Sequence, residues 1–221
     1  MFSRNKIAML VAEFLGTGVL TAVVLAVSKS NIGIPYFVSI AVGLTVAALT
    51  VILGTVSGAQ LNPAITLGLW SARRIKTLPA VTYILAQLAG AMCAYWLYTY
   101  FINTHLTNVG KFESRMLVAE ATGAFIFAMG WAAVVYQKLE GGKAAFAVGG
   151  ALTMGVLVAS VGSGALINPA VALGVHSWVW GTYVLGPVLG AIIGFNLYAL
   201  LFAPADALMD SPAAVSKPKK K

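Results

Sequence analysis

The chain has 221 residues, of which 60% are hydrophobic and 9% are charged. Such a composition is typical of membrane proteins and excludes an ordinary soluble domain. The net charge of +8 does not indicate a nucleic-acid-binding protein, because the basic residues are scattered around apolar segments and form no patch. The single cysteine, Cys93, lies in an apolar run and cannot form an internal disulfide.

The apolar segments predict six membrane-spanning helices, since a spanning helix needs roughly 20 mostly apolar residues. In chain order they are Ile7–Val27, Pro35–Thr55, Leu78–Ile102, Arg115–Tyr136, Ala144–Val161 and Gly181–Phe202. Two further apolar segments, Asn62–Trp70 and Asn168–His176, are too short to span a bilayer. We expect them to be half-helices that enter the membrane and stop there. The expected fold class is therefore an all-α membrane protein with six transmembrane helices and two re-entrant half-helices.

The tripeptide Asn-Pro-Ala stands at the start of both half-helices. The two copies are Asn62-Pro63-Ala64 and Asn168-Pro169-Ala170. Asn caps free backbone N–H groups at a helix start, and Pro fits the first helical position. A helix that begins inside a membrane needs a buried or water-lined site for its backbone polar groups. Two such starts indicate a pore or a binding site.

The two halves of the chain repeat one another. Residues 1–107 and 108–204 each contain two spans, a half-helix and a third span. Because three is an odd number of spans, the second copy must enter the membrane from the opposite side. The functional site of such an inverted repeat is expected near the middle of the membrane. The two half-helix N-termini can meet there, and their partial positive charges oppose the passage of cations and protons.

Glu13 and Glu120 are the acidic residues expected within the spans, at matching places in the two repeats. An intramembrane carboxylate is costly and indicates a functional role. We expect each carboxylate to accept hydrogen bonds from the non-helical backbone before a half-helix. A proton relay in a secondary transporter is the alternative. We find no metal-ligand cluster, nucleophile–base pair or phosphate-binding glycine loop in the sequence, so we expect no enzyme, cofactor or metal.

The Lys and Arg residues predict the orientation in the membrane. With the N-terminus in the cytoplasm, eleven of them lie on the inner side and three on the outer side. We therefore expect cytoplasmic N- and C-termini and a location in the plasma membrane. Residues 205–221 are rich in Pro, Ala and Lys and are expected to form a flexible tail. The tail can touch anionic lipid, although a solvated end without a role is the simpler interpretation.

The duplicated motifs and their flanking residues resemble the aquaporin (major intrinsic protein) family. The resemblance rests on Ser57-Gly58-Ala59-Gln60-Leu61-Asn62-Pro63-Ala64, on Gly164-Ala165-Leu166-Ile167-Asn168-Pro169-Ala170 and on the Ala-Glu-x-x-Gly starts of the first and fourth spans. It covers about residues 7 to 203. It implies a right-handed six-helix bundle and a homotetramer with a pore in every subunit. It also implies passive conduction of water or small neutral solutes such as glycerol, with Asn62 and Asn168 orienting solute at the centre.

The family's second, outer constriction departs from its usual pattern in this chain. Aligned on the motifs, the four positions of this filter are Val42, Val156, Ala165 and Val171. The family normally has an arginine at the place of Val171. Without Arg the filter loses a cation and its hydrogen-bond donors, so it either passes bulkier neutral solutes or dewets and passes water poorly. A structural membrane protein with little conduction, or a transporter that uses Glu13 or Glu120, are the alternatives to a channel.

Overall fold

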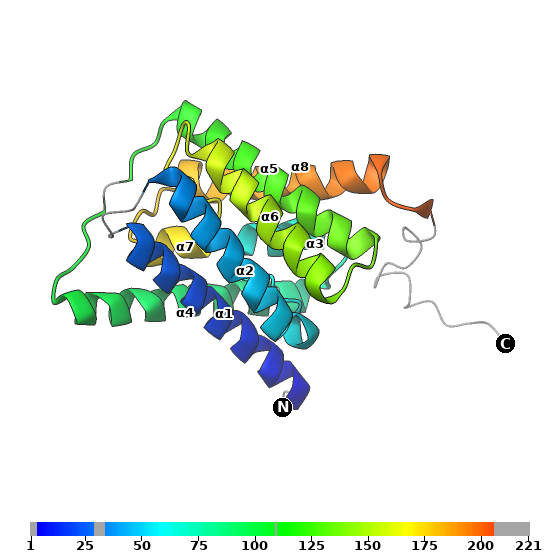
Figure 1. Cartoon of the computed structure of the whole chain (residues 1–221), viewed down its shortest axis with the longest axis horizontal. Coiled ribbons are helices and arrows are strands. Elements are labelled where there is room, and N and C mark those ends of the chain that lie inside the picture. The colour runs from blue at the N-terminus through cyan, green and yellow to red at the C-terminus, as the bar shows by residue number, and fades with distance from the viewer. Residues whose placement is uncertain (1–3, 29–33, 109, 206–221) are drawn as a thin grey trace.

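The computed structural model describes residues 4–28, 34–108 and 110–205, and this part of the chain is helical with short connections. The long helices are α1 (Arg4–Ser28), α2 (Pro35–Ser57), α4 (Thr77–Ile102), α5 (Ser114–Tyr136), α6 (Gly141–Ala159) and α8 (Gly186–Leu201). A π-helical turn, η1 (Trp180–Leu185), continues directly into α8. Two short helices, α3 (Pro63–Ser71) and α7 (Pro169–Gly174), lie among the long ones (Figure 1). The predicted tail falls outside the described residues, except for its first residue.

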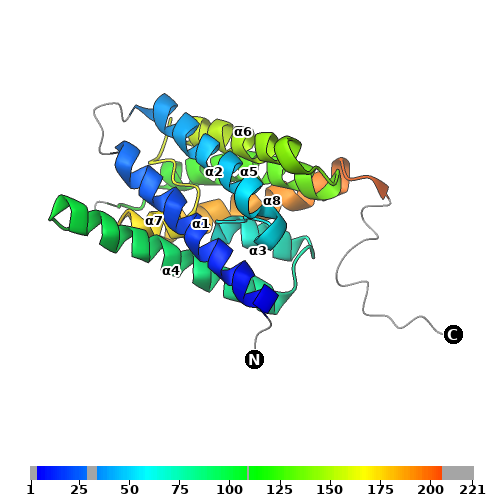
Figure 2. The same ribbon diagram turned by 60° about the horizontal axis from the view of Figure 1, so that its bottom comes forward.

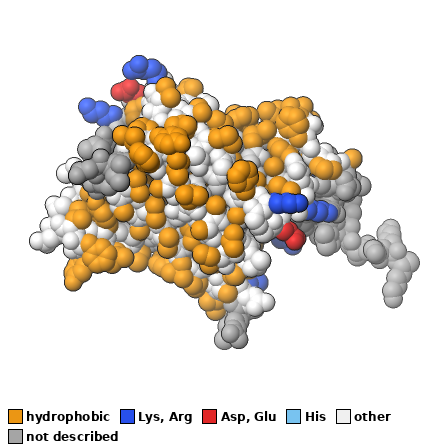
Figure 3. Space-filling model, viewed as in Figure 1, with side chains coloured by type: hydrophobic (Ala, Val, Ile, Leu, Met, Phe, Trp, Pro, Cys, Tyr) orange, Lys and Arg blue, Asp and Glu red, His pale blue; other side chains and the backbone are white. Residues whose placement is uncertain are grey.

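Six helices of the described part are long and apolar enough to cross a membrane, which confirms the predicted number of spans. They are Asn5–Ser28, Pro35–Ser57, Thr77–Ile102, Ser114–Tyr136, Gly141–Ala159 and Trp180–Leu201. Hydrophobic side chains cover most of the face seen in Figure 3, while charged side chains gather at its upper left and at its right. A surface with an apolar middle and charged ends suits a bilayer, whose hydrocarbon core disfavours charge.

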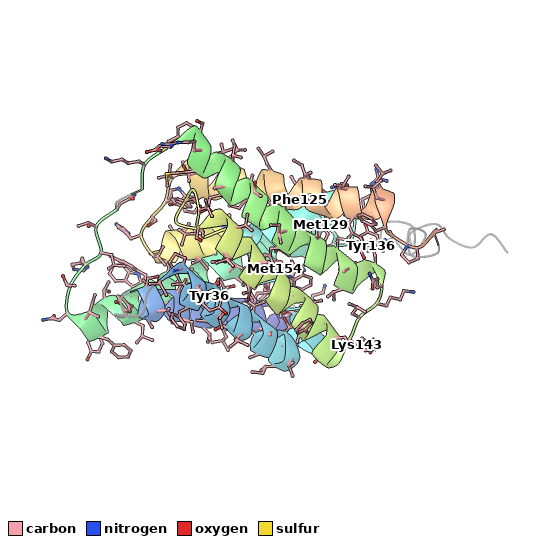
Figure 4. The ribbon with its side chains drawn as sticks, turned by 45° about the horizontal axis from the view of Figure 1, so that its top comes forward. Tyr36, Phe125, Met129, Tyr136, Lys143 and Met154 are labelled. Atoms are coloured by element: carbon pink, nitrogen blue, oxygen red, sulfur yellow. The ribbon has the colours of Figure 1, made fainter. Side chains whose placement is uncertain are left out.

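The half-helices point to opposite ends of the bundle. We call the end where α1 begins and α8 ends the inner end, and the opposite end the outer end. Figure 2 shows α3 toward the inner end and α7 toward the outer end. Figure 4 shows Tyr136, the last residue of α5, and Lys143, near the start of α6, at the inner end. This arrangement confirms the inverted repeat with two re-entrant half-helices.

Matching helix pairs of the two repeats pack through matching glycines. A Cβ added at Gly90 of α4 would lie 2.0 Å from the carbonyl oxygen of Phe14 in α1. A Cβ added at Gly190 of α8 would lie 2.0 Å from the carbonyl oxygen of Ala121 in α5. Only glycine fits so close an approach between helix backbones, which is the usual role of small residues between membrane helices.

Candidate functional site

The two Asn-Pro-Ala motifs meet in the middle of the bundle and are hydrogen-bonded to one another. Asn62 Oδ1 accepts from the N–H of Ala64 (2.8 Å), and Asn168 Oδ1 accepts from the N–H of Ala170 (3.0 Å), so each side chain caps its own half-helix. Asn62 Nδ2 donates to the carbonyl of Ile167 (3.0 Å), and Asn168 Nδ2 donates to the carbonyl of Leu61 (2.9 Å). Each amide nitrogen carries a second hydrogen besides the one that this cross-bond uses.

The residue before each Asn has an unusual backbone conformation. Leu61 has φ of 52° and Ile167 has φ of 39°, in the left-handed region that branched residues disfavour. Such a conformation costs on the order of 1–3 kcal/mol and persists only where the surroundings impose it. Here the carbonyl of each residue accepts from the Asn of the other repeat, and its N–H donates to a buried glutamate. Both backbone polar groups of each strained residue are therefore hydrogen-bonded, which fixes the peptide units on its two sides.

Glu13 and Glu120 are fully buried and accept the backbone donors of the two non-helical runs. Glu13 Oε1 accepts from Ser57 Oγ (2.6 Å) and Gln60 N (3.0 Å), and Glu13 Oε2 accepts from Leu61 N (2.8 Å) and Gln87 Nε2 (2.8 Å). Glu120 Oε1 accepts from Ser163 Oγ (2.7 Å) and Leu166 N (3.1 Å), and Glu120 Oε2 accepts from Ile167 N (2.6 Å). These bonds satisfy N–H groups that have no helical partner, a need that is acute where no bulk water is present.

A cavity extends from the two Asn side chains toward the outer end, where the exposed Ser28 borders it. It is lined by Leu20, Val24, Ser28, Val38, Val42, Val46, Gln60, Leu61, Asn62, Phe127, Leu152, Val156, Gly164, Ala165, Leu166, Asn168 and Val171. The centres of water-sized molecules have about 50 Å³ available in it. Since one water needs roughly 10–15 Å³ by this measure, the cavity holds a few waters.

All four predicted filter residues and both Asn residues line this one cavity. Val42, Val156, Ala165 and Val171 come from α2, from α6, from the loop before α7 and from α7 itself. Each of the four is at most 7% exposed. The Pro and Ala residues of the two motifs are buried and are not among the lining residues. The structure thus places Asn62 and Asn168 at the inner end of a cavity with largely apolar walls.

Two polar residues of this region, Gln60 and Gln87, had no assigned role in the sequence. Gln60 lines the cavity, and its Oε1 accepts from Thr66 Oγ1 (2.7 Å). Gln87 Nε2 donates to both Glu13 Oε2 and Thr66 Oγ1 (3.1 Å). In the second repeat Pro187 stands at the place of Gln87, so duplication does not point to this network. The available signal is a lone amide within an apolar span.

A cavity bordered by two opposed half-helices inside a six-span bundle defines a membrane channel. The sequence profile described as "Major intrinsic protein" matches residues 2–198. Aquaporin Z of Photorhabdus laumondii is 31% identical over 225 aligned positions, which cover 88% of this chain and 97% of that protein. Aquaporin NIP1-4 of Oryza sativa subsp. japonica is 35% identical over 221 aligned positions, which cover 92% of this chain and 80% of that protein.

The fold is also that of a solved structure. The aquaglyceroporin from Plasmodium falciparum superposes with a TM-score of 0.74 at 22% identity, and the match covers 89% of this chain and 96% of that one. The chain belongs to the major intrinsic protein family. It is an integral, multi-pass membrane protein and a passive channel for water and small solutes, not an enzyme.

Proposed function

We propose that the cavity is the outer part of a pore that passes water and small neutral solutes such as glycerol and urea with little discrimination between them. The observation that carries this proposal is the lining itself. Both capping amides and four small apolar residues line one cavity, and none of its lining residues in the described chain is charged. A neutral solute can hydrogen-bond to Asn62 and Asn168 and turn its carbon atoms to the valine wall.

Val171 is central to the proposed selectivity. It is 2% exposed, follows the second motif directly and lies on the cavity wall. An arginine there would bring a cation and up to five N–H donors into the narrow space. With valine, a solute meets neither that bulk nor that charge. We therefore assign the outer filter to Val42, Val156, Ala165 and Val171, with size selection relaxed relative to a filter that contains arginine.

The two glutamates have a supporting role in the same proposal. Because Glu13 and Glu120 accept the N–H groups of Leu61 and Ile167, they fix the residues whose carbonyls hold the two Asn side chains. No acidic residue lines the cavity within the described part of the chain. A buried carboxylate that accepts three or four hydrogen bonds and does not line the cavity is suited to support and not to proton transfer.

We further propose a homotetramer in the plasma membrane with cytoplasmic termini and with the repeats divided at residues 107 and 108. The basic residues favour this orientation, since Arg73, Arg74, Lys76, Lys138 and Lys143 all lie in connections at the inner end or close to them. Native mass spectrometry of the purified protein measures the number of subunits. A monomer or dimer as the dominant species contradicts the proposed tetramer and leaves the proposed pore untouched.

Stopped-flow light scattering of proteoliposomes tests the proposed conduction. Water, glycerol and urea gradients are applied in turn, and we expect all three permeabilities to exceed those of empty vesicles. Permeabilities equal to those of empty vesicles would favour the structural protein of this fold. Solute uptake driven by an imposed pH gradient would favour the transporter. High water permeability with background glycerol and urea permeability would refute the relaxed filter.

A further inference from the structure

The cavity ends, on its inner side, near Phe127 of α5. One helical turn further toward the inner end stands Trp131, about 6 Å along the axis by the usual rise per residue. Its side chain is 5% exposed, and its indole nitrogen has no hydrogen-bond acceptor among the described residues. A buried Trp N–H usually finds a partner, so this donor calls for an explanation.

The packing of α5 shows where the indole points. Gly130 of α5 faces α6, because a Cβ added there would lie 2.3 Å from the Cβ of Ala151. Ala128 of α5 faces α8, because a Cβ added at Gly194 would lie 2.8 Å from its Cβ. At 100° per residue, Trp131 lies between these two faces and on the stripe of Phe127. Met129, labelled in Figure 4, lies on the opposite face of α5.

The helices that line the cavity carry further buried apolar side chains at the level of Trp131. On α6, Val156 and Leu152 line the cavity, and Val148 follows one turn further inward. On α2, Val46 lines the cavity and Leu49 follows. Val148 and Leu49 are buried and belong with Trp131 to one core cluster. The indole N–H is thus a donor without a partner among the described residues, in apolar surroundings and on the face of α5 that carries the cavity-lining Phe127.

We propose that Trp131 forms an inner constriction of the pore and that its N–H donates a hydrogen bond to a passing water, hydroxyl or carbonyl oxygen. The inference rests on the proposed function, because it places a second station on the same solute path. The indole ring is bulky and limits the width of the path, and its nitrogen is a donor without acceptor capacity. Water that crosses an otherwise apolar stretch gains a fixed partner there, which opposes dewetting.

Two substitutions separate the bulk of the indole from its donor. Trp131→Phe keeps an aromatic wall and removes the N–H, so water permeability in proteoliposomes should fall about two- to five-fold, as expected for one lost hydrogen bond. Trp131→Leu removes the ring, so glycerol permeability should rise at least three-fold. The control is Trp96→Phe, since Trp96 is 59% exposed on α4 and should leave both permeabilities unchanged. Equal permeabilities in all three variants and the unmodified protein overturn the proposal.

A second measurement does not depend on conduction. The indole N–H of Trp131 is assigned in a protein labelled with ¹⁵N-Trp by the signal that Trp131→Phe removes. In a water-filled path this proton exchanges with solvent within seconds to minutes, whereas in a dry core it stays protected for hours. Protection for hours overturns the inner constriction even if the channel conducts. Rapid exchange in a protein without measurable permeability supports the placement of Trp131 and refutes the proposed conduction alone.

Discussion

Replacement of Glu13 by glutamine tests the support of the first half-helix. Each carboxylate oxygen of Glu13 accepts two donors, so either orientation of the new amide turns its NH₂ group toward donors. If NH₂ replaces Oε1, the Ser57 hydroxyl can rotate and become an acceptor, but the N–H of Gln60 loses its partner. If NH₂ replaces Oε2, the N–H of Leu61 loses its partner.

The expected cost follows from this count of donors. One buried backbone N–H without a partner costs about 1–3 kcal/mol, so Glu13→Gln should lower the free energy of unfolding by about that amount. Glu13→Ala leaves the donors of both oxygens unpaired and should cost at least twice as much. The matched control is Glu113→Gln, because Glu113 is exposed and its pair with Arg115 (3.5 Å) lies on the surface. The control should change stability by less than about 1 kcal/mol.

The assay is reversible unfolding in mixed detergent micelles, read by circular dichroism, together with water permeability in proteoliposomes. Glu13→Gln should lower both the stability and the permeability, because the carbonyl of Leu61 fixes Asn168. A Glu13→Gln protein that is as stable as the control refutes the supporting role. An unchanged stability with loss of solute uptake driven by a pH gradient indicates a proton relay instead.

Three further substitutions test the packing, the filter and the pore centre. Gly190→Ala should lower the free energy of unfolding by about 1–3 kcal/mol, because the new Cβ clashes with α5. The control is Gly150→Ala, where a Cβ meets nothing within 4 Å, and it should be neutral or stabilising by up to about 1 kcal/mol. Equal unfolding midpoints of the two variants refute the close packing. Val171→Arg should narrow the cavity and lower the ratio of glycerol permeability to water permeability about ten-fold. If neither the glycerol permeability nor the water permeability changes, Val171 does not line the constriction. Asn168→Asp replaces the N–H donor to the Leu61 carbonyl with an oxygen and should lower the free energy of unfolding by about 1–3 kcal/mol. A variant with the same unfolding midpoint as the unmodified protein contradicts a stabilising bond between Asn168 and Leu61.

The spans could be predicted from the sequence because length and apolarity decide them, but their ends could not. Helix α6 begins at Gly141, three residues before the predicted start, since Gly and Lys carry no apolar signal. The half-helix α7 ends at Gly174, two residues before the predicted end. His176 already has φ of 60° and stacks on Tyr95, a contact with a distant helix that local pattern does not contain.

The sequence did not predict the π-helical turn η1, which lies just before Pro187. Pro187 has no N–H, so the carbonyl of Tyr183 receives no bond from the residue four positions further on. The backbone before it widens, and the N–H of Gly186 donates to the carbonyl of Gly181. A proline in the first turn of α8 is visible in the sequence, but the choice between a kink, a new start and a π turn depends on the packing of α8 against α5.

The sequence predicted which residues line the cavity, but it could not predict which atoms bond to one another at its inner end. Val42, Val156, Ala165 and Val171 were predicted from the resemblance to the aquaporin family, aligned on the two motifs, and all four line the cavity. The bonds from Asn62 to the Ile167 carbonyl and from Asn168 to the Leu61 carbonyl join residues more than one hundred positions apart. The sequence indicated that the half-helices meet, but the partner of each amide depends on atomic positions that only the folded chain has.

In the proposed pore, different side chains provide the support of the centre and the selectivity of the outer filter. The hydrogen bonds that fix the centre run between Glu13, Leu61 and Asn168 and between Glu120, Ile167 and Asn62, and none of them uses a side chain of the filter. The four filter side chains are apolar and contribute bulk alone. A substitution such as Val171→Arg therefore changes what the pore admits without removing a bond of the central frame, while Glu13→Gln removes a bond of the frame and leaves the filter side chains in place. Val171 contacts this frame through its backbone, because its N–H donates to Asn168 Oδ1 (3.4 Å). A change of its side chain therefore leaves the donors and acceptors of the frame in place.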